Sequence, residues 1–285
     1  KSAAPAGLSM GFARLHGGRT SAIVDASKPP SGANSLNAHA STLAFELTSG
    51  RRPLIVNCGS GTSFGPDWRR AGRATPSHST LGVEGYSSSR LGPKKVVGGV
   101  PREILVDTPK DVRVQFLSED EFEAIIVGHD GYLPTHGLTH IRRIDLSHNG
   151  RSLAGEDTLA AIERPDEQIF EKALDRSNLQ GISFQIRFHL HPDVDAALDM
   201  GGTAISMALK SGEIWVFRHD GTAKLSLEPS IYMEKGRISP RATKQMVLSG
   251  VAVEYATRIR WTLAKAQETP NAVRDLQRDE GTEPT

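Results

Sequence analysis

Four residues in the first third of the chain carry the side chains best suited to chemistry: Asn37, His39, Asn57 and His78. Imidazole can bind a metal or transfer a proton, whereas an amide can hydrogen-bond a sugar but cannot transfer a proton near neutral pH. If residues 37–47, NAHASTLAFEL, are extended, alternation places Asn37 and His39 together at the polar start of one strand face. A histidine at a strand entrance is more often a hydrogen-bonded structural residue. A chemical role therefore requires that these side chains converge, which their spacing alone does not establish.

Two further groups of residues have weaker claims to a role. Arg69, Arg70 and Arg73 stand in the stretch WRRAGR, where a solvated face is the usual role and binding of an anionic ligand is the minority one. His189 and His191 alternate on one predicted strand face, and such pairs are more often sheet-surface or cross-strand residues than metal ligands. From the residues alone we assign a role to neither group.

The composition is that of an ordinary globular protein. The chain has 285 residues, of which 38% are hydrophobic and 24% charged, and its net charge is +1. This charge is too small to indicate a nucleic-acid partner, and no stretch reaches the ~20 apolar residues of a membrane span. The one cysteine, Cys58, excludes an intrachain disulfide and a Cys-based zinc ribbon. Because the sequence begins at Lys1 without a signal pattern, we expect a mature form or a domain of a longer protein.

Short alternating runs separated by turn residues extend along most of the chain. They predict about fifteen strands without a βαβ rhythm, and therefore an all-β fold, a large antiparallel β-sandwich over residues 1–265 with a polar tail at 266–285. Residues 59–99 are irregular apart from 80–86, and a loop of this length is more often functional than idle. Residues 164–176 suit either a short helix or a loop. The strand candidates are 12–15, 21–26, 43–47, 53–57, 102–107, 112–117, 122–132, 139–146, 152–159, 182–191, 203–210, 213–219, 222–228, 230–236, 244–250 and 251–266.

Several motifs together resemble a known family. The stretches HASTLAFEL, PLIVNCG, WRRAGRATPSHSTLGVEG, GHDGY, THIRRIDL, GEDTL and RFHLHPDV are similar to the C-terminal β-sandwich domain of the heparinase II/III-like polysaccharide lyases. The resemblance runs from about Phe12 to about Trp261, which is most of the chain. It implies a super-sandwich and, in the full-length parent, an N-terminal α/α-toroid that forms the other wall of a substrate cleft.

The same resemblance implies roles for the four residues. Family members read H-G-H-A-D-x-L-S-F-E-L, then V-D-x-G, then A-H-N-T or S-H-S-T; the second histidine, the aspartate of V-D-x-G and the later histidine hold zinc. Here those positions are His39, Asn57 and His78, so the resemblance implies a zinc site in which an uncharged amide replaces a carboxylate and weakens binding. The first histidine, which takes part in catalysis in the family, corresponds to Asn37, whose amide could face a sugar or a uronate carboxylate.

The implied activity is β-elimination on an acidic, uronic-acid-containing polysaccharide, in which preorganised charge stabilisation and general acid–base catalysis share the work. The resemblance makes Asn37 the catalytic position and places Arg69, Arg70 and Arg73 against anionic sugar. We expect the chain alone to be inactive, and the parent to work in the periplasm or cell envelope. The alternative is a non-catalytic glycan-binding or structural domain of a degenerate lyase, which the amides at Asn37 and Asn57 favour.

Overall fold

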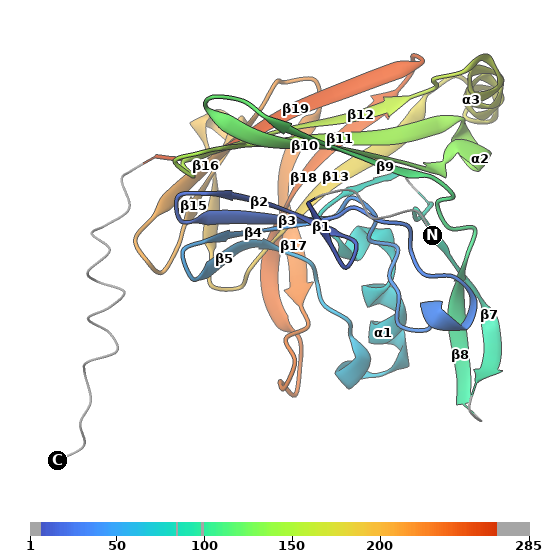
Figure 1. Ribbon diagram of the computed structural model, residues 1–285, viewed down its shortest axis with the longest axis horizontal. Coiled ribbons are helices and arrows are strands. Elements are labelled where there is room, and N and C mark those ends of the chain that lie inside the picture. Colours follow the sequence, from blue (N-terminus) through green and yellow to red (C-terminus); the bar gives the residue numbers. More distant parts are fainter. Residues whose placement is uncertain (1–6, 84, 98–99, 267–285) are drawn as a thin grey trace.

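The computed structural model describes residues 7–83, 85–97 and 100–266, and two large antiparallel sheets packed face to face form the body of the fold (Figure 1). The predicted all-β sandwich is confirmed. Nineteen strands are present in the described residues, a few more than the sequence indicated, because several are very short. The polar tail expected at 266–285 lies, from residue 267 onward, outside the described residues.

The first sheet has nine strands in the order β1-β2-β3-β4-β5-β13-β18-β17, with β6 paired to β13. Strands β2, β3, β4 and β5 fall on the candidates 12–15, 21–26, 43–47 and 53–57, and they form two hairpins that turn at Gly18 and Gly50. The strand bounds are β1 Leu8–Ser9, β2 Phe12–Gly17, β3 Thr20–Asp25, β4 Phe45–Ser49, β5 Arg52–Val56, β6 Leu81–Val83, β13 Ile182–Leu190, β17 Lys224–Tyr232 and β18 Arg241–Ala252.

The second sheet has eight strands in the order β14-β15-β16-β19-β12-β11-β10-β9. A separate hairpin, β7–β8, extends from one end of the sandwich beside the first helix (Figure 1). The bounds are β7 Arg90–Val97, β8 Val100–Val106, β9 Val112–Ser118, β10 Phe122–Tyr132, β11 Leu138–Ser147, β12 Ser152–Ala160, β14 Asp195–Asp199, β15 Ala204–Ala208, β16 Ile214–His219 and β19 Ala256–Lys265.

In the part of the chain that the structure describes, three α-helices and four 3₁₀ turns connect the strands. Of the two alternatives left open for residues 164–176, the helix is the observed one, and it begins with a capping box between Glu163 and Asp166. The irregular region 59–99 also contains a short helix and strand β7, which the sequence did not indicate. The bounds are α1 Pro66–Gly72, α2 Leu133–His136, α3 Arg164–Arg176, η1 Gly32–Ser35, η2 Thr62–Phe64, η3 Thr75–Ser77 and η4 Met200–Gly202. Within the described residues, no helix is long and apolar enough to cross a membrane.

The supposition that residues 37–47 are extended does not hold for their first part, and the strand candidate 43–47 begins two residues later than expected. Strand β4 begins only at Phe45, and the preceding residues form a loop in which Leu43 has a φ of 65°. The backbone N–H of Ala40 donates to the carbonyl of Arg73, and that of Leu43 donates to the carbonyl of Asp25. Because these partners come from distant segments, the loop satisfies its backbone without joining a ladder.

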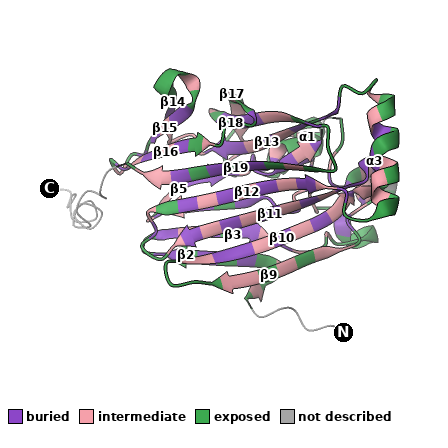
Figure 2. Ribbon diagram, turned by 90° about the horizontal axis from the view of Figure 1, so that it is seen from above, coloured by how far each residue is buried: buried purple, intermediate pink, exposed green. Residues whose placement is uncertain are grey.

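The core lies between the two sheets, where buried and more exposed residues alternate along the strands (Figure 2). Its centre is aromatic: Trp261 of β19 stacks on Phe45 at 5.6 Å between ring centroids and meets Phe188 at 4.8 Å. Gly155 of β12 is the cross-strand partner of Trp261, and a Cβ at this glycine would lie 2.1 Å from an indole carbon. The indole therefore depends on the absence of a side chain opposite it.

Replacing Gly155 with alanine should destabilise the fold by about 1–3 kcal/mol, because the added methyl overlaps a ring that has no room to move. The measurement is urea unfolding followed by Trp fluorescence. Gly82→Ala in β6 is the matched control, since its Cβ would meet nothing closer than 3.5 Å. Equal loss of stability in the two variants would contradict the packing argument.

Candidate functional site

The structure brings His39 and His78 into direct contact. His39 Nδ1 lies 3.0 Å from His78 Nε2, and the two rings meet edge to face with centroids 5.2 Å apart. His78 Nδ1 lies 2.9 Å from the carbonyl oxygen of Ala74, which can only accept, so this nitrogen carries the proton. His78 Nε2 is then the acceptor, and His39 Nδ1–H donates to it. The loop before β4 and the turn after η3 are thereby joined through two imidazoles.

Both imidazoles are neutral at physiological pH. Burial lowers the pKa of His39 to about 4, and the nearby Arg73 and Arg69 charges add to the effect. Burial likewise lowers the pKa of His78 to about 3, with a further contribution from His39. A neutral imidazole has one nitrogen lone pair to offer, which is the form that binds a metal and accepts a hydrogen bond.

Asn57, the third predicted metal ligand, lines the same groove of about 350 Å³ as the two histidines. Its Oδ1 accepts from the backbone N–H of Ser79 at 2.9 Å, and its Nδ2 donates to Glu46 Oε1 at 3.1 Å. These two partners fix the amide orientation. The three residues for which the family resemblance implies a zinc site therefore line one groove.

The same groove contains a carboxyl group that the sequence did not single out. Asp25, at the end of β3, accepts a hydrogen bond of 2.6 Å from the hydroxyl of Ser41. Burial raises the pKa of Asp25 to about 6, against the lowering effect of that hydrogen bond. No pattern of spacing links residue 25 to residue 39, so only the folded structure shows that they line the same groove.

The donor set fits a zinc ion incompletely. Two imidazole nitrogens face each other, and the Nδ1–H of His78 is held by a carbonyl in the way usual for metal-bound histidine. The remaining donor, Asn57 Oδ1, carries no charge and already accepts from Ser79. Within the described residues, no three His, Cys, Asp or Glu side chains are close enough to hold a metal. Zinc would also require the His39 proton to leave Nδ1.

A second groove, of about 640 Å³, begins at Asn37 and continues between α1 and the β7–β8 hairpin. Arg69 of α1 donates to Asn37 Oδ1 at 3.1 Å and to the carbonyl of Leu36. Arg70 forms an ion pair with Glu103. Four cationic and two acidic side chains line this groove: Arg69, Arg70, Lys94 and Arg102, with Asp67 and Glu103. We name it the Asn37 groove; of the predicted substrate-binding residues, it contains Arg69 and Arg70.

Arg73 is placed differently from the other two arginines. It is 1% exposed, and its guanidinium donates to the carbonyls of Ser35, Ala38 and Glu103 at 2.8–2.9 Å. All three carbonyls belong to segments that border the Asn37 groove. The side chain therefore holds the walls of the groove together instead of facing its interior.

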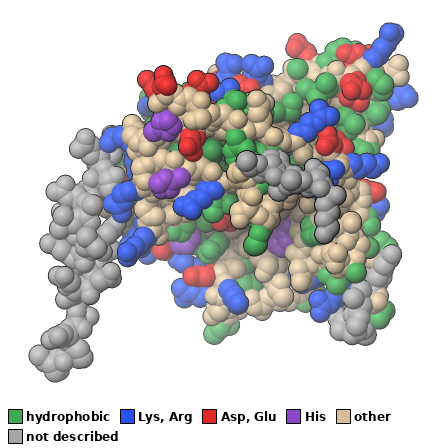
Figure 3. Space-filling view, viewed as in Figure 1, with side chains coloured by type: hydrophobic (Ala, Val, Ile, Leu, Met, Phe, Trp, Pro, Cys, Tyr) green, Lys and Arg blue, Asp and Glu red, His purple; other side chains and the backbone are tan. Residues whose placement is uncertain are grey.

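Charge on the surface is mixed: on the face seen in Figure 3, Lys and Arg are interspersed with Asp and Glu. Long-range attraction of an anion by the whole molecule is therefore weak, in keeping with the net charge of +1. An anionic ligand would have to be recognised by local groups, as in the Asn37 groove.

The family model described as "Heparinase II/III-like, C-terminal" matches residues 1–262. A curated relative, FtsZ-localized protein C of Caulobacter vibrioides, is 29% identical over 274 residues, covering 90% of this chain and 42% of the relative. A solved heparinase III matches with a TM-score of 0.67 at 12% identity, covering 93% of this chain and 36% of that one. A mutant of the heparan sulfate lyase HepC from Pedobacter heparinus matches with a TM-score of 0.65 at 14% identity, covering 92% of this chain and 36% of that one.

The chain thus spans less than half the length of these relatives. At 12% and 14% identity, the match to these solved structures shows similarity of the fold alone. A larger parent with another domain is consistent with the lengths.

The buried histidines give the stability of the fold a defined pH dependence. His189, which its pattern suggested to be a surface or cross-strand residue, is 2% exposed and donates from Nε2 to the carbonyl of Pro76. Burial lowers its pKa to about 4, as it lowers those of His78, His129 and His140. Below the unfolded-state pKa of about 6.5, the unfolded chain binds protons that the folded chain does not, so stability falls with pH.

The urea-unfolding free energy should accordingly be lower at pH 5 than at pH 7.5, by about 2 kcal/mol each for His78 and His189, whose pKa values are about 3 and about 4. Asp25 acts in the opposite direction below pH 6, because its raised pKa lets the folded state bind a proton first, but it is one group against several. Equal free energies at the two pH values would contradict neutral burial of the histidines.

Proposed function

Because the chain belongs to the heparinase II/III-like C-terminal family, we propose that it binds an acidic polysaccharide in the Asn37 groove and forms one wall of a lyase cleft in its full-length parent. The observation that carries the proposal is the hydrogen bond from Arg69 to Asn37. It fixes an amide next to a cation inside a groove large enough for a sugar. Both groups suit a uronate carboxylate, which accepts hydrogen bonds and carries negative charge.

The proposed reaction of the parent is β-elimination. A base removes the proton at C5 of the uronate, the C4–O bond breaks with formation of a C4–C5 double bond, and an acid protonates the leaving oxygen. Within this chain, Asn37 and Arg69 bind and orient the carboxylate, and their hydrogen bonds strengthen as negative charge develops on it. Asn37 transfers no proton. The acid and the base would come from the N-terminal α/α-toroid that the family resemblance implies.

A non-catalytic glycan-binding domain is the second candidate. It is favoured by the amides at Asn37 and Asn57, which keep hydrogen bonds but remove a titrating group and a charge from the site. The relative from Caulobacter vibrioides is also named for its localisation with FtsZ and not for cleavage of a polysaccharide. Both candidates use the same groove, so they differ in the chemistry of the parent and not in the ligand of this chain. The periplasm or cell envelope stays a prediction for the compartment.

Binding to this groove is tested with a hexameric oligogalacturonate and its neutral counterpart, maltohexaose. We expect the anionic oligomer to bind, and Arg69→Ala to weaken its affinity about tenfold, since the variant removes a cation and releases the Asn37 amide. Arg258→Ala, which removes an exposed arginine of β19, is the matched control. Absence of binding to the wild type, or equal losses in the two variants, would refute the proposed groove.

Catalysis is then decided with the full-length parent. A lyase produces an unsaturated uronate, whose ultraviolet absorbance rises with time, and the second candidate predicts binding without that product. Absence of product from uronic-acid polymers while binding is retained would refute the lyase and leave the binding domain.

Zinc binding at His39 and His78 is proposed as a weak interaction completed by Asn57. When bound, zinc would act as a structural ion between the two loops. We expect Asn57→Asp to raise zinc affinity, because it supplies the missing charge. Glu46 accepts from the amide of Asn57 and would repel an aspartate, so the variant is best made together with Glu46→Gln.

The measurement is zinc titration monitored by calorimetry at pH 7.5, where both imidazoles are neutral. The wild type should bind more weakly than Asn57→Asp with Glu46→Gln, by about tenfold or more, and His39→Ala with His78→Ala should not bind. Equal zinc uptake by the wild type and the double histidine variant would remove the site.

A further inference from the structure

Strand β9 is the last strand of the eight-stranded sheet, and among the described residues it pairs with β10 alone. An edge strand presents backbone donors and acceptors to which another chain can add. Apolar surface extends along both sides of this edge. Val114 lines a groove of about 540 Å³ on the outer face of the sheet and a second of about 460 Å³ that also contains Met10. Met10 is 90% exposed.

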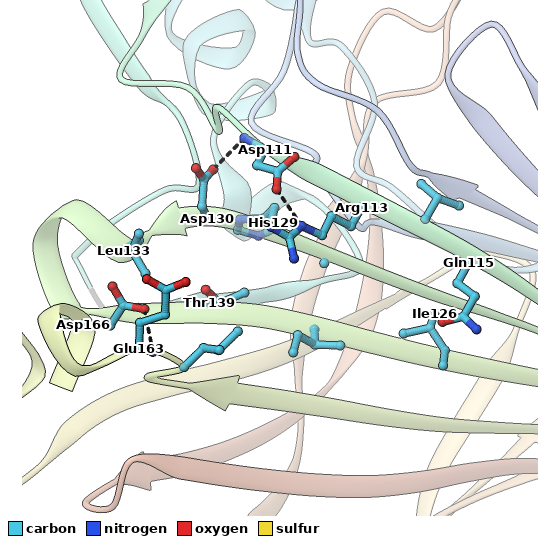
Figure 4. Close-up of a pocket in the computed structure, with 14 residues that line it drawn as sticks. Asp111, Arg113, Gln115, Ile126, His129, Asp130, Leu133, Thr139, Glu163 and Asp166 are labelled. Carbon is cyan, nitrogen blue, oxygen red and sulfur yellow. Dashed lines mark hydrogen bonds and ion pairs between the residues drawn. The ribbon is translucent and has the colours of Figure 1, made fainter. Parts of the chain in front are cut away.

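The outer groove has two chemically different ends (Figure 4). Ile126 and Gln115 lie at one end, on β10 and β9, and Ile141 adds to the apolar floor. At the other end lie four carboxylates from three segments, Asp111, Asp130, Glu163 and Asp166, together with the apolar side chain of Leu133. Ile162, which is 59% exposed, adjoins the acidic end.

The carboxylates are only partly used within the protein. Asp130 accepts from the backbone N–H groups of Lys110 and Asp111 through Oδ1, and Asp111 pairs with the exposed guanidinium of Arg113. Glu163 and Asp166 cap α3. One arginine faces four acids, so this end of the groove remains negative overall.

We propose that the β9 edge is a docking site for an extended peptide segment of a partner protein, which adds as an antiparallel strand and has a basic residue at its C-terminal end. Main-chain pairing with β9 would provide affinity, and the apolar floor would accept alternate side chains. The antiparallel direction follows the rest of this sheet, where every pair is antiparallel. It places the peptide's C-terminal end beside Asp111, which precedes β9, and charge complementarity then requires a cation there.

Charge patterning on the strand itself supports this occupant over a second copy of the chain. Arg113 is a charged residue on the edge, a feature that discourages pairing of identical edges. If two copies paired through antiparallel β9 strands, the acidic end of each groove would lie beside the C-terminal end of the other β9, and the pairing would bring no cation to it. A partner peptide with its own lysine or arginine has no such difficulty.

The probe is the peptide acetyl-Thr-Val-Thr-Val-Thr-Lys-Lys-amide, with a fluorophore for anisotropy. Two analogues share its length: one has Glu-Glu in place of Lys-Lys, and one is N-methylated at alternate residues so that it cannot pair along one edge. We expect the lysine peptide to bind about tenfold more tightly than the glutamate peptide, and the N-methylated one not to bind.

The protein variant is Asp130→Asn with Glu163→Gln, which keeps the oxygen acceptors that hold the backbone while removing two charges. It should reduce the preference for lysine over glutamate to about twofold. Asp175→Asn with Glu254→Gln, two exposed acids outside the groove, is the matched control and should retain the preference.

Three results would overturn the inference: no binding of the lysine peptide to the wild type, equal binding of the N-methylated peptide, or an unchanged preference in the groove variant. A fourth is concentration-dependent dimerisation in sedimentation that the groove variant abolishes, which would assign the edge to a second copy. None of these readouts depends on polysaccharide binding, so the inference and the proposed function stand or fall separately.

Discussion

The buried ion pair between Arg142 and Asp157 connects the sandwich to both loops of the candidate site. Arg142 of β11 and Asp157 of β12 face each other across the sheet, with Nε–Oδ1 and Nη2–Oδ2 distances of 2.8 and 3.1 Å. Nη1 of the same guanidinium donates to the carbonyls of Leu43 and Ser79, each at 2.9 Å. Leu43 is in the loop that carries His39, and Ser79 follows His78. One side chain thus holds both histidine segments against the second sheet.

The energetics of this pair explain why it organises more than it stabilises. Burial by itself would raise the pKa of Asp157, but the Arg142 charge and the hydrogen bond from His140 keep it well below the usual value, so the carboxylate stays ionised. Desolvation of two ions offsets much of their attraction. The pair does determine where the guanidinium points. Because Nε and Nη2 of the planar guanidinium are both held by Asp157, the direction of Nη1 is fixed. The two loop carbonyls lie in that direction.

How much of this was predictable from the sequence depends on the range of the interactions. The hairpins β2–β3 and β4–β5 follow from local alternation and glycine turns, and the sequence predicts them correctly. The loop before Phe45 could not be told from extended chain by its sequence, because its hydrogen-bond partners, Asp25 and Arg73, lie outside any local window. The family resemblance placed Arg73 against anionic sugar, and no local pattern indicated its burial, which depends on carbonyls that only the fold brings together. That His39 and His78 lie together could be predicted only from the family resemblance.

The site that results contains two adjacent grooves with different electrostatics. His39 and His78 are neutral and hydrogen-bonded, whereas the Asn37 groove is lined by charged side chains, of which four are cationic and two acidic. Asparagine at positions 37 and 57 fits this division, because an amide keeps a fixed hydrogen-bonding direction without a charge that must be desolvated or titrated. At both positions the amide has a fixed hydrogen-bonding direction, but it cannot transfer a proton or give a metal ion a negatively charged ligand. In the proposed function, the Asn37 amide and the neighbouring arginines bind the ligand through hydrogen bonds and charge, and proton transfer is assigned to the α/α-toroid that the family resemblance implies.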